Sequence, residues 1–263
     1  MREITTIVTT AGRPDDLSMA LAAFACKQLN VPFEPRKKRS VRKISESLHA
    51  NVIVAGKNRF EYYAFGASEP FFFHPNSAAF RLKRVARGEA EPFLEAMQLQ
   101  QGDSILDCTL GLAADAMIAA FTVGEQGSVV GLEADPNVAF IVAQGMQTYD
   151  TTELPLTGCM RQIEVVQAEA VVYLRLLPDN AFDVVYMDPM FEEVIEEATN
   201  FEALRSAGAH VALTDEWVQE AKRVAKKRVV LKAHFRSEWF EMYGFTRLTR
   251  VTSKFHYGVY EKI

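Results

Sequence analysis

The first third of the chain alternates short apolar runs with stretches of helical periodicity. Residues 4–10 are rich in β-branched side chains and alternate in polarity, which predicts a strand. Residues 15–29 place apolar side chains at helical spacing, with Asp15 or Asp16 as the candidate cap of the helix. A second short helix is predicted over 40–49, and the pattern of 52–66 predicts a β-hairpin. These elements predict a small N-terminal α/β domain over residues 1–75.

A more regular pattern begins at residue 104. Short apolar strands alternate there with amphipathic helices, which is typical of βαβ units around a parallel sheet. The predicted parallel strands cover residues 104–109, 128–134, 163–168, 182–188 and 228–233. Two further strands, at 245–252 and 254–262, are expected to form an antiparallel hairpin that closes the sheet. The pattern predicts a doubly wound α/β domain over 76–263, with a basic helix leading into a mostly parallel seven-stranded sheet.

The composition of the 263 residues is that of an ordinary globular protein, with 49% hydrophobic and 24% charged residues. No apolar run approaches the ~20 residues that a membrane-spanning helix needs, and the start of the chain lacks the pattern of a secretory signal. The three cysteines form no CxxC pair and no cluster with histidine, which argues against a disulfide framework and a zinc site. We expect a cytoplasmic protein with no metal and no membrane segment.

Charge is distributed unevenly along the chain. Residues 1–90 carry 15 basic and 8 acidic side chains, residues 91–221 carry 3 and 23, and residues 222–263 carry 11 and 3. Basic ends that flank an acidic middle favour a polyanionic partner. The densest run, residues 36–43, has six basic residues in eight, although such a run is also typical of a solvated loop and helix start. The candidate contacts are Arg36, Lys37, Lys38, Arg39 and Lys232, the last at the end of the fifth predicted strand.

The residues that follow the parallel strands are the candidates for chemistry, because open parallel sheets bind ligands beyond the carboxyl ends of their strands. The first strand leads into DCTLGLAADA, which supplies Asp107, Thr109, Gly111 and Asp115. A glycine there lets the backbone approach a ligand closely, and a carboxylate suits a ligand with an amine-bearing tail. Only one glycine of the GxGxxG fingerprint is present, which disfavours a nicotinamide dinucleotide.

The second and third strands add further candidates. Glu133 lies 22 residues beyond Gly111, close to the offset at which an acidic residue reaches ribose hydroxyls. Capping of the following helix is the alternative, and it fits Asp135 better than Glu133. Ala168 and Glu169 follow the third strand and are placed to flank an adenine ring, with a helix-start acid as the alternative role of Glu169.

The fourth strand delivers the sequence Asp188, Pro189, Met190 and Phe191. The Asp188 carboxylate and a backbone carbonyl near Pro189 can accept hydrogen bonds from an exocyclic amine, and Phe191 can stack on a planar ring. An ordinary strand-ending turn is the alternative, since Asp-Pro is common in loops.

Together, DCTLGLAADA, the strand that ends at Glu133 and the stretch VVYMDPMF resemble a class I S-adenosylmethionine (SAM)-dependent methyltransferase. The DPMF sequence and the stretch AKKRVVLKA resemble, more narrowly, the ribosomal RNA small subunit methyltransferase J family over residues 74–263. The resemblance implies SAM as cofactor, ribosomal RNA or the small ribosomal subunit as partner, and a guanine 2-amino group as methyl acceptor. It also implies Asp188 as the catalytic-loop acid and a cofactor site at Ala114, Asp115, Glu133, Ala134, Glu169 and Ala170. Ala113 and Ala114 stand where the family has a glycine and an arginine.

Three functions are compatible with these features. The leading hypothesis is a methyltransferase that acts on an exocyclic amine of an RNA base, which the enzyme must position and desolvate. A methyltransferase of a small molecule or protein would make the basic run incidental. A non-catalytic RNA-binding protein that keeps the fold would bind RNA without turning over SAM.

Overall fold

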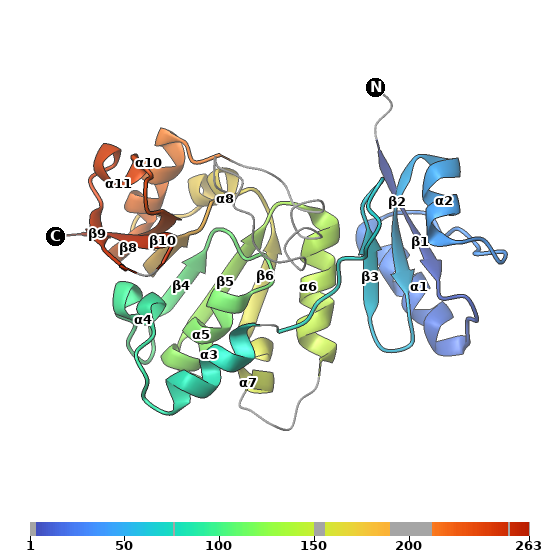
Figure 1. Cartoon of the computed structure of the whole chain (residues 1–263), viewed down its shortest axis with the longest axis horizontal. Coiled ribbons are helices and arrows are strands. Elements are labelled where there is room, and N and C mark those ends of the chain that lie inside the picture. Colours follow the sequence, from blue (N-terminus) through green and yellow to red (C-terminus); the bar gives the residue numbers. More distant parts are fainter. Residues whose placement is uncertain (1–3, 76, 150–155, 190–211, 252, 263) are drawn as a thin grey trace. The chain divides into compact units, whose positions relative to one another are not determined.

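The computed structural model describes residues 4–75, 77–149, 156–189, 212–251 and 253–262. These residues form two compact units (Figure 1). The first contains the chain up to His74 together with residues 135–149, and the second contains residues 75–134 and the described residues from 156 onward.

The first unit is a three-stranded sheet with helices packed on it. β1 (Thr5–Thr10) pairs in parallel with β2 (Ala50–Ala55), and β3 (Phe60–Tyr63) pairs with β2 in the antiparallel direction. α1 (Asp16–Leu29) is capped by Asp15, one of the two predicted candidates, whose Oδ1 accepts a hydrogen bond from the Ser18 backbone N–H at 2.9 Å. The remaining helices of this unit are α2 (Val41–Leu48) and α6 (Pro136–Thr148), the latter against β3.

The second unit is built on a seven-stranded sheet in the order β6-β5-β4-β7-β8-β10-β9. Its strands are β4 (Ser104–Asp107), β5 (Ser128–Glu133), β6 (Ile163–Gln167), β7 (Phe182–Met187), β8 (Ala225–His234), β9 (Thr246–Leu248) and β10 (Phe255–Glu261). Strands β4 to β8 pair in parallel, and β10 lies antiparallel between β8 and β9. This confirms the predicted mostly parallel sheet with its C-terminal antiparallel hairpin.

Helices cover both faces of the sheet, because successive strand residues point to opposite sides. On one face Phe93 of α4 packs edge-on against Tyr186 of β7, with 5.1 Å between ring centroids. On the other face Val185 of β7 shares a buried cluster with Leu174 and Trp217. The helices of the first face are α3 (Ser77–Ala86), α4 (Pro92–Met97), α5 (Ala114–Val123) and α7 (Leu156–Gln162); those of the second are α8 (Ala170–Leu176), α10 (Asp215–Val224) and α11 (Trp239–Met242). Within the described ranges, no helix combines the length and the apolar character that crossing a membrane requires.

The strand order places a switch point between β4 and β7. The chain runs outward from β4 through β5 to β6 and then returns to the other side of β4 as β7. Sheets of this kind bind ligands at the carboxyl ends of the strands beside such a switch. The loop after β4 lies close to the sheet here, since a Cβ added to Gly131 of β5 would be 2.3 Å from Leu110 Cδ1. Glycine at 131 therefore lets this loop settle over β5.

Candidate active site

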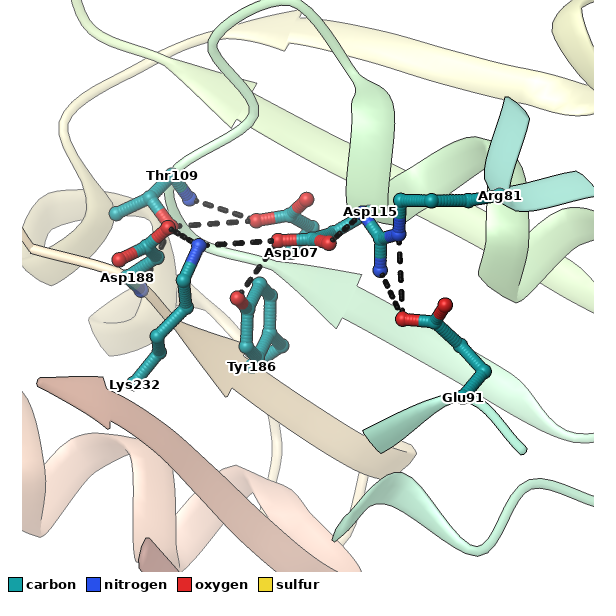
Figure 2. Close-up of polar contacts among 8 residues, drawn as sticks. All are labelled: Arg81, Glu91, Asp107, Thr109, Asp115, Tyr186, Asp188 and Lys232. Carbon is teal, nitrogen blue, oxygen red and sulfur yellow. Dashed lines mark hydrogen bonds and ion pairs between the residues drawn. The ribbon is translucent and has the colours of Figure 1, made fainter. Parts of the chain in front are cut away.

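Asp107 and Asp188 come from the neighbouring strands at the switch point, and Thr109 connects them. Asp107 is the last residue of β4, and Asp188 follows β7 directly. The Thr109 backbone N–H donates to Asp107 Oδ1 at 3.0 Å, and Thr109 Oγ1 accepts from the Asp188 backbone N–H at 2.8 Å. Figure 2 shows the threonine between the two carboxylates. The structure thus brings together three residues that the sequence singled out separately.

The Asp107 side chain is buried, and its pKa lies near neutral pH. Burial raises the pKa of Asp107 to about 7, although the hydrogen bonds from Thr109 act in the opposite direction. The carboxylates of Asp115 and Asp188 add to the increase. Near neutral pH the side chain is therefore divided between its protonated and ionised forms. A cationic group placed beside it would favour the ionised form.

A row of alternating charges runs from Asp188 into the protein (Figure 2). Lys232 Nζ of β8 lies 2.7 Å from Asp188 Oδ2 and 3.7 Å from Asp115 Oδ2. Asp115 Oδ1 in turn lies 2.5 Å from Arg81 Nη1 of α3. The row ends at Glu91, whose Oε1 is 2.8 Å from Arg81 Nη2. Each charge in the interior of the row has an opposite charge on either side.

The partners in this row decide which members stay charged. Burial opposes ionisation of Asp115, but Lys232 and Arg81 outweigh it and lower the pKa of Asp115 to about 2. Burial likewise opposes the charge of Lys232, yet Asp188 and Asp115 raise its pKa above the ordinary value. Burial raises the pKa of Asp188, and Lys232 acts against that increase. Asp188 is therefore a buried carboxyl group whose ionised form Lys232 stabilises.

One carboxylate oxygen of Asp188 takes part in none of these contacts. Oδ1 is buried and has no hydrogen-bond partner within the described parts of the chain. Pro189, the next residue, is buried as well, whereas the predicted Phe191 lies outside the described residues. A buried acceptor without a donor is costly, and a catalytic role or a bound water or ion is among the explanations for such an atom in a native protein. The Asp188 carboxylate can thus accept a hydrogen bond from a donor outside the described residues.

The loop after β4 turns sharply into α5. Gly111 and Ala113 both have positive φ angles, 49° and 60°. Ala113 is the N-cap of α5, and no side chain caps this helix end. Ala114 and Asp115 form the first turn, whose backbone N–H groups have no partner inside the helix. These predicted cofactor residues therefore lie at the edge of the sheet that carries Asp107.

The other predicted cofactor residues lie at the ends of β5 and β6. Glu133 ends β5, and its backbone carbonyl accepts from the Ala168 N–H at 3.0 Å, which ties the two strand ends together. The cap of α6 is Asp135 rather than Glu133. Glu169 is exposed at the N-cap of α8 and makes no side-chain cap bond. Ala134 and Ala170 add small side chains beside these residues.

The predicted basic contacts are divided between the two units. In the first unit, Arg36 Nη1 donates to the Thr10 carbonyl at 3.1 Å, and Arg39 pairs with Glu34, so both arginines hold their loop in place. Lys37 and Lys38 are exposed between them, in a turn with φ angles of 47° and 61°. Lys232 belongs to the second unit, beside Asp188.

Arg81, Glu91 and Tyr186 complete the site and were not predicted from the sequence. The Tyr186 hydroxyl donates to Asp115 Oδ2 at 2.8 Å. Its one sequence signal is its position two residues before Asp188, which places it on the same side of the strand. Arg81 gives a weaker signal as a single cation on the buried side of the basic helix, between Ala78 and Leu82.

The strand order, the antiparallel last strands and the acidic residues after β4, β5 and β7 define a class I SAM-dependent methyltransferase. The chain belongs to the family described as "Putative SAM-dependent methyltransferase", whose model matches residues 69–261. SAM is therefore its cofactor.

The chain is also similar to individual proteins. The chain is 43% identical to protein YpiP of Bacillus subtilis, over 96% of this chain and 98% of that protein. It is 31% identical to the ribosomal RNA small subunit methyltransferase J of Coxiella burnetii, over 49% of each chain. The match to the protein of that name from Rhodopseudomonas palustris is also 31% identical, over 59% of this chain and 71% of the other. The fold resembles that of a SAM-dependent methyltransferase from Neisseria gonorrhoeae, with a TM-score of 0.62, 18% identity and coverage of 98% of this chain and 96% of the other.

Proposed function

We propose that this protein transfers a methyl group from SAM to the exocyclic 2-amino group of a guanine in small-subunit ribosomal RNA. The observation that carries the proposal is the buried Oδ1 of Asp188, which has no partner among the described residues and lies at the switch point of the sheet. The partial similarity to proteins named ribosomal RNA small subunit methyltransferase J supports the choice of acceptor. We expect the protein to act in the cytoplasm, where ribosomal subunits are assembled.

The reaction requires a weak nucleophile to be held and aligned. The lone pair of a guanine 2-amino group is delocalised into the ring, so the amine must be oriented before it attacks. Hydrogen bonds from the amine to Asp188 Oδ1 and to the backbone carbonyl near Pro189 hold the nitrogen and localise its lone pair. SAM supplies the electrophilic methyl group when it is bound. As the nitrogen–carbon bond forms and the carbon–sulfur bond breaks, the amine proton passes to Asp188 or to water.

The residues at the strand ends fit SAM by their chemistry. Asp107 offers a carboxylate to the amino group of the cofactor, and Glu133 offers one to its ribose hydroxyls. We propose that the adenine ring lies against the ends of β5 and β6. The residues assigned to the cofactor site in this proposal are Asp107, Thr109, Gly111, Ala114, Asp115, Glu133, Ala134, Ala168, Glu169, Ala170 and Asp188.

For the RNA, we propose a contact through the basic loop of the first unit. Arg36 and Arg39 hold the loop against the sheet, and Lys37 and Lys38 extend from it as exposed cations. Lysines arranged in this way bind phosphates as point charges and contribute affinity without reading sequence.

Neutralising this loop tests the RNA contact. We expect Lys37→Gln/Lys38→Gln to weaken binding to ribosomal RNA and to lower the slope of log affinity against log salt by about one per lysine. The rate at saturating RNA stays near that of the wild type. The matched control is Lys27→Gln/Lys226→Gln, which removes two exposed lysines elsewhere. Unchanged affinity and salt slope in the first double variant would mean that the basic run is incidental.

The proposed activity is tested by methyl transfer from labelled SAM to small-subunit particles and to naked ribosomal RNA, both from a strain that lacks this gene. We expect the label in 2-methylguanosine after nucleoside analysis. Label in another nucleoside would overturn the guanine assignment. Binding of SAM without incorporation into RNA would favour a small-molecule or protein acceptor. Binding of RNA without binding of SAM would favour a non-catalytic protein.

A further inference from the structure

Lys232 occupies a position that its strand fixes closely. β8 is an interior strand of the sheet, parallel to β7 on one side and antiparallel to β10 on the other. Leu231 is in register with Met187, so the next residue along β8 comes level with Asp188. The Lys232 side chain is 22% exposed and places its ammonium between two carboxylates. An arrangement of this kind holds a lysine in one geometry, at a cost in conformational freedom.

We propose that Lys232 is a positioning residue, which holds Oδ2 of Asp188 so that Oδ1 faces the substrate amine as an ionised acceptor. Asp115 and Arg81 support it, because Asp115 provides the second carboxylate for Lys232 and Arg81 holds Asp115. We call the contact by which Lys232 holds Asp188 the clamp. The identity of the amine rests on the proposed function, whereas the clamp does not.

The surroundings of Asp188 explain why a clamp is needed. The titratable groups that act on it are Lys232 of β8, Asp115 of α5, Asp107 of β4, Tyr186 of β7, Tyr257 of β10 and Arg81 of α3. Two of these are carboxyl groups, which repel a third negative charge. Within the described residues, Lys232 is the cation that contacts Asp188 directly. Without Lys232, burial and the two neighbouring acids would raise the pKa of Asp188 further.

These contacts give Lys232 a different role from that of the exposed lysines. Its Nζ already has a carboxylate partner at 2.7 Å and a second at 3.7 Å. A phosphate at this ammonium would have to compete with both carboxylates and would be repelled by them. We therefore assign Lys232 to Asp188 rather than to the RNA backbone, for which the exposed Lys37 and Lys38 are suited.

The pH dependence of methyl transfer distinguishes this role from a merely structural one. In Lys232→Gln, we expect the acidic midpoint of the rate profile to move up by about one to three pH units. Below the wild-type midpoint the rate falls by up to about tenfold for each unit of that shift, and it recovers as the pH is raised above the new midpoint. Lys232→Arg keeps the charge and the midpoint, and Lys226→Gln, an exposed change at the start of the same strand, behaves as the wild type. A rate that is lower at every pH without a shifted midpoint would contradict the clamp.

A second measurement separates the clamp from the choice of substrate. The carboxyl carbon of Asp188 can be followed by NMR in protein labelled with ¹³C-aspartate, with Asp188→Asn to assign the signal and without any RNA. We expect the Asp188 midpoint to be higher by one or more pH units in Lys232→Gln than in the wild type. If this shift is found while ribosomal RNA is not methylated, only the proposed acceptor is wrong. An unchanged Asp188 midpoint would overturn the clamp, whatever the acceptor.

Discussion

Replacing Asp188 with asparagine is expected to slow methyl transfer at saturating SAM by about 10²–10⁴-fold while the protein still folds. Asparagine keeps the shape of the side chain and one carbonyl oxygen. It loses the negative charge that holds the substrate amine and that takes up its proton. The loss appears in the rate of the chemical step, measured in a single turnover with enzyme in excess over RNA.

Asp183 provides a matched control for this variant. It lies on the same strand but at the amino end of β7, where its Oδ2 accepts from Ser104 Oγ at 2.7 Å. Asp183→Asn removes the same charge far from the switch point, so we expect a rate within about threefold of the wild type. If Asp188→Asn and Asp183→Asn were equally active, Asp188 would have no part in the chemistry.

Replacing Asp107 with asparagine is expected to weaken SAM binding by about 10- to 100-fold, which is the range for a lost hydrogen bond to a charged group. We expect the wild-type affinity to depend on pH, because burial raises the pKa of Asp107 to about 7 in the free protein. Below that pH the side chain must lose a proton before it can pair with the cofactor amine. We therefore expect the SAM dissociation constant to rise by up to about tenfold for each pH unit from 7 toward 5. In Asp107→Asn this part of the pH dependence disappears.

Ionised Asp107 is expected to lower the free energy of unfolding when SAM is not bound. The folded pKa of Asp107 lies above its unfolded value, so the folded state binds more protons in the window from pH 4 to 7 and loses stability as the pH rises through that window. Asp107→Asn removes the ionisation and is expected to be more stable at pH 8 without SAM, by up to roughly 4 kcal/mol. Thermal unfolding at pH 5 and pH 8, with and without SAM, measures this. A variant that is less stable than the wild type at pH 8, yet binds SAM equally well, would contradict the assigned role.

Much of the site was predictable because the topology of a parallel sheet gathers its strand ends. Asp107 and Asp188 are 81 positions apart in the chain, yet each follows a recognisable apolar strand, and the carboxyl ends of such strands meet at one edge. The start of α1 was predictable for a local reason, since Asp15 lies directly before an apolar helical pattern and accepts a bond from the first turn.

The rest depends on contacts that no local pattern encodes. Arg81 reaches Asp115 from a helix that precedes the sheet, and Tyr186 reaches it from the opposite direction in the sequence. In the sequence, Arg81 is one cation in a basic helix and Tyr186 is one aromatic residue in a strand, and neither pattern predicts a contact with Asp115. Helices α4 and α7 have six and seven residues, which is too short for a hydrophobic period to be recognised. Lys232 was predicted at the end of a strand, but β8 continues to His234, and the partner of Lys232 depends on the register between β7 and β8.

The most direct test of the central claim is a comparison of small-subunit ribosomal RNA from four strains: the wild type, a deletion of this gene, and the deletion complemented with either the wild-type gene or Asp188→Asn. Nucleoside mass spectrometry combined with mapping of the modified position would be applied to each. The account predicts one 2-methylguanosine that is absent from the deletion, restored by the wild-type gene and not restored by Asp188→Asn. Identical ribosomal RNA methylation in the wild type and the deletion would contradict it.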